Sequence, residues 1–192
     1  DWVALSNFQP QRLFTDAHAA EKIPQALPAC QVLRSLNAEV ELTALVAELN
    51  AEFVRQQPQL FDTVTVLLDG SDNFACRFLL NEIAVARHIP YIYGAAVATE
   101  GCVMPVIPGH TACLSCLMLS QHRPDTEATC ASTGVLASSI LQTAAMQFTL
   151  TIKVITGQLA ACLSQWVFFD LWQQQQFTLP VPIRPDCPTC QQ

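Results

Sequence analysis

Two pairs of closely spaced cysteines carry the strongest chemical signal in this sequence. The spacing C-x-x-C occurs at Cys113 and Cys116 and again at Cys187 and Cys190. Two such pairs can close a tetrahedral Zn²⁺ site, with each sulfur about 2.3 Å from the metal. Because four thiolates leave no open coordination position, we expect a structural zinc site; two redox dithiols or two disulfides are the alternatives. About 70 residues separate the pairs, so the metal would join the end of this chain to its middle.

Five of the nine cysteines lie outside these pairs. Cys130 follows a polar stretch and precedes a long apolar segment, and a thiol near a helix N-terminus can have a lowered pKa and act as a nucleophile. An inert thiol is the alternative at this position. Cys30, Cys76 and Cys162 lie in apolar helical patterns and are expected to pack as small hydrophobic residues, whereas Cys102 is ambiguous.

Two aspartates follow a short run of apolar and β-branched residues. Residues 63–68 are predicted to form a buried strand that ends at Asp69 and Asp72, and near-helical apolar spacing continues from 73 to 89. A second strand is expected at 90–93, which completes a βαβ unit with parallel strands. Ligands bind at the carboxyl ends of such strands, so both aspartates are placed at a functional edge. A role for Asp72 as the helix N-cap alone is the alternative.

The remaining elements are predicted from periodicity and from helix breakers. We expect a helix at 22–36 weakened by Pro24 and Pro28, a strand at 39–42 and a helix at 44–56. Further along we expect extended structure at 95–106 broken by Gly101, a buried helix at 135–155, and an antiparallel pair at 166–179. No Gly/Ser-rich linker divides the sequence, so one domain over 1–192 is predicted.

Composition narrows the function classes. The chain has 192 residues, of which 51% are hydrophobic and only 13% charged, so a subunit interface is expected to cover part of its surface. The net charge of −7 argues against a nucleic-acid partner. Polar residues interrupt the apolar stretch 135–155, which argues against a membrane helix. The start of the sequence shows no secretory signal, so a cytoplasmic protein is expected, as part of a longer chain.

An ordered set of short motifs across nearly the whole chain resembles the ThiF/MoeB/HesA family, the bacterial relatives of ubiquitin-activating enzymes. The motifs are Ser6-Asn7-Phe8-Gln9-Pro10-Gln11, Leu68-Asp69-Gly70-Ser71-Asp72-Asn73, Arg77, Asn81, Ile89-Pro90, Gly94-Ala95-Ala96, Glu100-Gly101, the first cysteine pair, Cys130 with Gly134-Val135-Leu136, and Pro185-Asp186-Cys187-Pro188-Thr189-Cys190.

The resemblance implies an α/β, Rossmann-like nucleotide-binding fold with a mainly parallel sheet and C-terminal antiparallel strands. It also implies a homodimer that uses ATP and Mg²⁺ to adenylate the C-terminal glycine of a small ubiquitin-like sulfur-carrier protein, as in thiamin or molybdopterin biosynthesis. The family assigns Mg²⁺ and the phosphates to the equivalent of Asp72, and the nucleotide to those of Asp1 and Asn7. Arg77 would support this site, with a salt bridge at the sheet edge as the alternative. In the thiamin branch, the equivalent of Cys130 bonds to the thiocarboxylated carrier.

The sequence departs from the family pattern around the phosphates. No Gly-rich phosphate loop occurs, so the family's N-terminal strand–helix unit is expected to be missing from this chain. Pro10 and Ile23 stand where the family has an arginine and a lysine, with Arg12 and Lys22 close by. Either these neighbours bind the phosphates, or the chain is a catalytically degenerate scaffold or recognition subunit of a protein-modifying complex.

Overall fold

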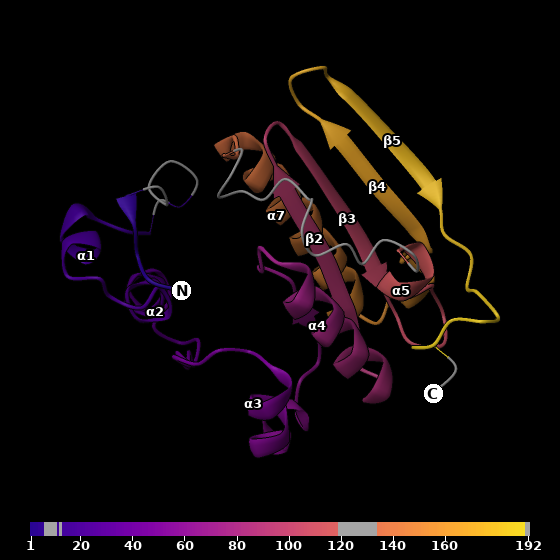
Figure 1. Ribbon diagram of the computed structural model, residues 1–192, viewed down its shortest axis with the longest axis horizontal. Helices are drawn as coiled ribbons and strands as arrows, with labels where there is room; N and C mark the ends of the chain where they lie inside the picture. Colours follow the sequence, from indigo (N-terminus) through magenta and orange to yellow (C-terminus); the bar gives the residue numbers. More distant parts are fainter. Residues whose placement is uncertain (6–10, 12, 119–133, 191–192) are drawn as a thin grey trace. The chain divides into compact units, whose positions relative to one another are not determined.

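The computed structural model describes residues 1–5, 11, 13–118 and 134–190 (Figure 1). They fall into two compact units, Asp1–Leu49 and Asn50–Gln192, which are taken separately below. The prediction of one domain over the whole chain therefore stays a prediction.

The first unit contains helices α1 (Asp16–Ala20) and α2 (Ala26–Leu36). The helix predicted from residue 22 begins later, because Lys22 adopts a left-handed conformation and Pro24 forms an antiparallel bridge with Trp2. Pro28 is tolerated because it lies in the first turn of α2, where its missing N–H is not needed. The strand predicted at 39–42 is wrong: the carbonyl oxygen of Leu42 accepts a hydrogen bond from Arg34 Nη2 at 2.7 Å, and no ladder partner is present among the described residues.

The second unit combines a five-stranded sheet with helices. The strands are β1 (Leu67–Leu68), β2 (Tyr91–Val97), β3 (Glu100–Val106), β4 (Gln165–Asp170) and β5 (Gln175–Pro180). The α-helices are α3 (Ala51–Gln56), α4 (Phe74–Ala86), α5 (Leu114–Leu117) and α7 (Ala137–Ile155), and the 3₁₀ helices are η2 (Pro58–Phe61) and η3 (Leu159–Ala161).

The sheet is mixed, in the order β1-β2-β3-β4-β5, and this corrects the expectation of a mainly parallel sheet. Only β1 and β2 run parallel, joined by the predicted crossover through α4. The later pairs are antiparallel. For β2 and β3 the reason is that Ala98 and Thr99 alone connect them, and so short a link permits only a hairpin. Gly101, predicted to break this segment, lies inside β3, and the turn falls instead at Ala98 with φ 50°.

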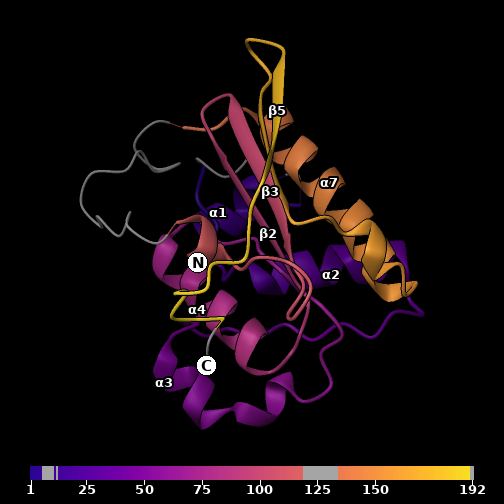
Figure 2. The ribbon, with the colours of Figure 1, turned by 90° about the vertical axis from the view of Figure 1, so that its right-hand side faces the viewer.

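Helices cover both faces of the sheet, with α7 packed on β2 and β3 from one side and α4 against β2 (Figure 2). Beneath α7 the core consists of Ile92, Val103, Ile107, Val154 and Cys162. This core confirms that Cys162 packs as a small hydrophobic residue. The sheet and its two helix layers give the α/β fold that the sequence predicts.

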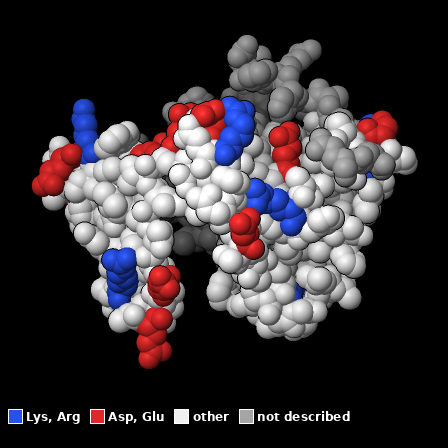
Figure 3. All heavy atoms as spheres, turned by 90° about the horizontal axis from the view of Figure 1, so that it is seen from below, with Lys and Arg blue, Asp and Glu red and all other residues white. Residues whose placement is uncertain are grey.

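The surface carries few charges. Figure 3 shows Lys, Arg, Asp and Glu side chains scattered over a face that is mostly uncharged, in keeping with the low charged fraction of the sequence. Among the described residues, no helix is both long and apolar enough to span a bilayer.

Candidate functional site

The turn between β1 and α4 presents Asp72 at the carboxyl end of a parallel strand. Helix α4 is capped by Asn73, whose side-chain oxygen accepts a hydrogen bond from the Cys76 N–H at 2.9 Å. The N-cap role considered for Asp72 is therefore wrong. The exposed carboxylate of Asp72 accepts a hydrogen bond from Asn73 Nδ2 at 3.3 Å and is otherwise accessible to a ligand.

Asp69, in contrast, is buried and acts inside the turn. One carboxylate oxygen accepts hydrogen bonds from the backbone N–H and the hydroxyl of Ser71, at 2.9 and 2.6 Å, and the other accepts from the Tyr91 hydroxyl. Burial, together with this carboxylate, raises the pKa of Tyr91 far above its usual value, so the phenol stays a donor. Asp69 therefore shapes the turn that carries Asp72.

Arg77 supports the same turn from α4. Its Nη2 donates to the Ser71 carbonyl oxygen at 3.1 Å, and its guanidinium lies 4.9 Å from the ring centre of Phe74 and 5.8 Å from that of Tyr93. The buried Nε atom has no hydrogen-bond partner, and the side chain makes no salt bridge, within the part of the chain that is described. The salt-bridge alternative for Arg77 finds no support there, and its guanidinium is held behind the turn as a buried positive charge.

Gln147 is a site residue that sequence reasoning missed. From α7 its side-chain amide donates to the carbonyl oxygens of Asp69 and Ile92, at 2.9 and 3.0 Å, where β1 and β2 separate. Gly94 leaves room for this amide, since a Cβ atom there would lie 2.5 Å from Gln147 Nε2. The available signal was the row of polar residues Ser139, Thr143 and Gln147 at four-residue spacing, which α7 buries.

The nucleotide-contact candidates in the first unit are only partly described. Asn7 and Arg12 lie outside the described residues, as does Pro10. Asp1 is exposed, and its carbonyl oxygen accepts a hydrogen bond from the Gln25 N–H at 3.0 Å. Lys22 is exposed at a φ of 50°, next to the half-buried Ile23. Since these residues belong to a different unit from Asp72, a shared nucleotide site stays a prediction.

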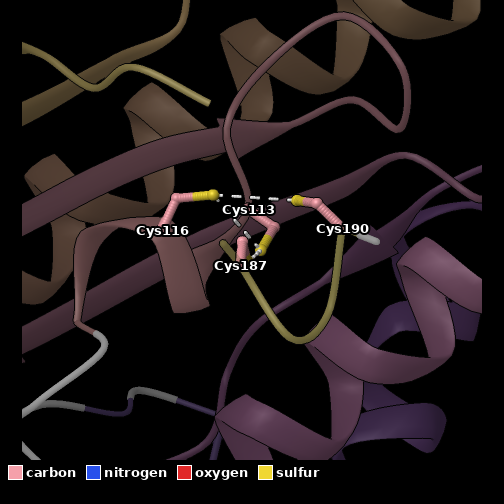
Figure 4. Close-up of side chains that lie close together, drawn as sticks. All are labelled: Cys113, Cys116, Cys187 and Cys190. Atoms are coloured by element: carbon pink, nitrogen blue, oxygen red, sulfur yellow. Dashed lines mark hydrogen bonds between the residues drawn. The ribbon is translucent and has the colours of Figure 1, made fainter. Parts of the chain in front are cut away.

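The four cysteines of the C-x-x-C pairs converge, as predicted (Figure 4). Their sulfur atoms all lie within 4.8 Å of one another, and the Cys113–Cys187, Cys116–Cys190 and Cys113–Cys116 sulfurs are 3.6, 3.7 and 3.9 Å apart. Four thiolates arranged tetrahedrally at about 2.3 Å from a metal would be about 3.8 Å apart. The cysteines are free thiols rather than disulfides, so this cluster could hold a metal ion.

The pKa values of the cluster thiols are shifted in both directions. Burial raises the pKa of the Cys113 thiol. At Cys187, burial opposes ionisation, but hydrogen bonds from the backbone of Cys190 and Thr189 prevail and lower the pKa. Burial and neighbouring thiols raise the pKa of Cys190. A bound cation would favour the thiolate form of all four. Cys130, the candidate nucleophile, lies outside the described residues.

A family model described as the ThiF family matches residues 1–190. The chain belongs to the ThiF family. Its curated relatives include the sulfur carrier protein ThiS adenylyltransferase of Bacillus subtilis, 35% identical over 192 residues, which covers 99% of this chain and 55% of that protein. The SAMP-activating enzyme E1 of Haloferax volcanii is 30% identical over 190 residues, which cover 99% of this chain and 68% of that protein. The sulfur carrier protein ThiS adenylyltransferase of Escherichia coli is 30% identical over 191 residues, which cover 99% of this chain and 73% of that protein.

Solved structures agree on the fold of this ThiF-family chain. The E. coli MccB structure with ATP superimposes with a TM-score of 0.77 at 18% identity, covering 100% of this chain and 58% of that one. The microcin C7 biosynthetic enzyme MccB in complex with N-formylated MccA gives a TM-score of 0.79 at 18% identity, covering 99% and 58%. The chain spans only about half the length of these proteins and of the B. subtilis relative.

Proposed function

We propose that the protein to which this chain belongs uses ATP and Mg²⁺ to adenylate the C-terminal glycine of a small ubiquitin-like sulfur-carrier protein. The observation that carries the proposal is the accessible Asp72 carboxylate at the carboxyl end of β1, in the turn to which Arg77 bonds through the Ser71 carbonyl oxygen. Ligands of α/β sheets bind at such an edge. The relatives from B. subtilis and E. coli, named as ThiS adenylyltransferases, point to the same reaction.

In this proposal each residue of the turn has a separate task. Mg²⁺-bound ATP supplies an electrophilic α-phosphate and pyrophosphate as the leaving group. Asp72 provides hard oxygen ligands for the cation. Arg77 places a positive charge behind the turn that favours the phosphates, and Asp69 and Gln147 hold the turn. Asp1, Asn7, Arg12 and Lys22 are proposed as further nucleotide contacts.

The cysteine cluster is assigned a structural Zn²⁺ ion. The donor set of four thiols and the spacing of their sulfur atoms support zinc, which four thiolates bind tetrahedrally. Cys113, Cys116, Cys187 and Cys190 would be the ligands, and no coordination position remains for substrate. Cys130 is proposed as the thiol that bonds to a thiocarboxylated carrier: its thiolate attacks the C-terminal carbonyl carbon, a thioester forms, and hydrosulfide leaves. Mass spectrometry of the protein incubated with such a carrier would detect the adduct, and a Cys130→Ala variant should lack it.

A homodimer in the cytoplasm completes the proposal. One side of α7 leaves large apolar residues exposed, among them Leu141, Phe148 and Ile155, and a second copy could cover them. The described cysteines are all free, as expected in a reducing compartment.

Pyrophosphate exchange by the full-length protein with its carrier tests the reaction. Asp72→Asn removes the charge that would hold Mg²⁺, so exchange should fall about 100- to 1,000-fold, the usual cost of losing one preorganised electrostatic group. Asp62→Asn is the matched control, because Asp62 is an exposed aspartate of the same unit that pairs with Arg87. Exchange by Asp72→Asn at the wild-type rate would refute the assignment of Asp72.

A scaffold or recognition subunit without adenylation activity is the second candidate. The observation favouring it is Ile23, an apolar, half-buried residue where the family has a phosphate-binding lysine. Calorimetry separates the two functions: the enzyme binds ATP measurably, and the scaffold binds only its protein partner.

A further inference from the structure

Two hydroxyl side chains occupy inner positions of the two C-x-x-C pairs and contact each other. Ser115 lies between Cys113 and Cys116, and Thr189 lies between Cys187 and Cys190. Their hydroxyl oxygens are 2.8 Å apart, and the residues are only 7% and 5% exposed. The two cysteine pairs are therefore joined by a buried hydrogen bond in addition to their sulfur atoms.

Asn81 connects this bond to helix α4. Asn81 is completely buried, and its side-chain NH₂ donates to the Ser115 hydroxyl at 3.3 Å. Its carbonyl oxygen accepts a hydrogen bond at 2.8 Å from the N–H of Leu114, the residue that directly follows Cys113. One amide thus fixes both the backbone and a side chain of the first cysteine pair, one helical turn after Arg77.

Asn81, Ser115 and Thr189 depend on one another for hydrogen bonds because all three are buried. A buried polar group that loses its partner keeps its desolvation cost, so a network of this kind holds its members in one arrangement. None of the three needs to contact a sulfur atom to affect metal binding. They act by setting the distance between two turns that each bring two sulfurs.

We propose that Asn81, Ser115 and Thr189 form a positioning network that holds the two cysteine pairs at metal-binding distance and fastens them to α4. The inference rests on the proposed metal site and goes beyond it, since it assigns part of the metal affinity to residues that are not ligands. Outer-shell partners typically contribute about 10- to 100-fold to metal affinity.

The test is the zinc affinity of the full-length protein, measured by competition with a chromophoric chelator. Ser115→Ala and Thr189→Val should each weaken binding by about 10- to 100-fold. The double variant should be no weaker than the worse single variant, because both substitutions break the same bond. Thr189→Ser keeps the hydroxyl and should retain wild-type affinity. Thr143→Val is the matched control: Thr143 is also buried, on α7, and bonds to the Ser139 carbonyl oxygen.

Each outcome is decisive. Unchanged zinc affinity in both Ser115→Ala and Thr189→Val would overturn the network, as would strictly additive losses in the double variant. If Ser115→Ala does not fold, the comparison of Thr189→Ser with Thr189→Val still isolates the hydroxyl. A wild-type protein that binds no zinc would refute the metal site and the network together. Zinc binding with the expected losses, but without pyrophosphate exchange, would refute adenylation alone.

Discussion

At the scale of single residues, Tyr91 and Tyr93 show how burial and charge act together beside the candidate site. They are the only tyrosines of the chain, and both are almost completely buried. Burial raises the pKa of both phenols well above their ordinary value of 10.0, and the Asp69 carboxylate raises that of Tyr91 further. Ionising either phenol inside the folded protein would place a negative charge in an apolar environment, and for Tyr91 next to a carboxylate.

We therefore predict an alkaline limit to stability. Below pH 10 both phenols are neutral in the folded and unfolded states, so their contribution to the free energy of unfolding is fully present. Above pH 10 the unfolded chain loses these protons while the folded protein keeps them, so the free energy of unfolding falls as pH rises. In an alkaline titration, tyrosinate absorbance should appear only together with loss of circular dichroism. Tyrosinate formation in the still-folded protein would contradict this prediction.

The sequence predicts the chemistry of several site residues but not their contacts. The convergence of the four cysteines follows from residue type and spacing, and so does the position of Asp72 after a strand. The N-cap was misassigned by one residue, because either of two adjacent polar side chains could cap α4. Gln147 was missed since its partners are carbonyl oxygens of β1 and β2, far away in the sequence.

At the scale of elements, local sequence patterns predicted whether a segment is a helix or a strand better than they predicted which strands pair. The βαβ unit was predicted correctly because helical periodicity and β-branched runs are visible locally. The strand at 39–42 had the right alternation and no neighbour to pair with among the described residues, and a strand needs a partner for its backbone groups. β1 is shorter than predicted because its partner β2 starts only after Pro90, where the chain leaves a left-handed turn at His88.

The packing of α7 on β2 gives a prediction at this scale. A Cβ atom at Gly94 would lie 2.5 Å from Gln147 Nε2 and 2.6 Å from its Cδ, so Gly94→Ala forces the side chain away from the strands. Overpacking of this kind costs about 1–3 kcal/mol, which denaturant unfolding can measure. Gly70→Ala is the control: a Cβ atom there would have no neighbour within 4 Å among the described residues, and the change should stay within about 0.5 kcal/mol.

A double-variant cycle assigns that cost to the proposed contact. Gln147→Ala alone loses the hydrogen bonds to Asp69 and Ile92, but it also removes the atoms that Gly94→Ala would strike. The double variant should therefore be more stable than the sum of the two single effects predicts. Strict additivity would show that Gly94→Ala acts elsewhere.

At the scale of the whole molecule, antiparallel strands extend a single βαβ unit into a five-stranded sheet, and the chain then returns from β5 to α5. Strand β5 is exposed along its whole length. The return segment that follows it, residues 181–190, buries few apolar side chains. Val181, Cys187 and Thr189 are the buried exceptions. The four cysteines, drawn in Figure 4, and the hydrogen bond between Ser115 and Thr189 therefore attach this segment to the rest of its unit.

Removing the proposed metal should accordingly loosen the C-terminal segment before it unfolds the sheet. A ligand that binds only the folded state stabilises it by about 4 kcal/mol when its free concentration is about 1,000 times its Kd, so chelation should lower the free energy of unfolding by a similar amount. Limited proteolysis should then cut within 181–190 first, because the core beneath α7 contains none of the four clustered cysteines. Cys187→Ser serves as the control, since chelator should not destabilise it further. Equal protease resistance with and without chelator would mean that packing, rather than metal, holds the segment in place.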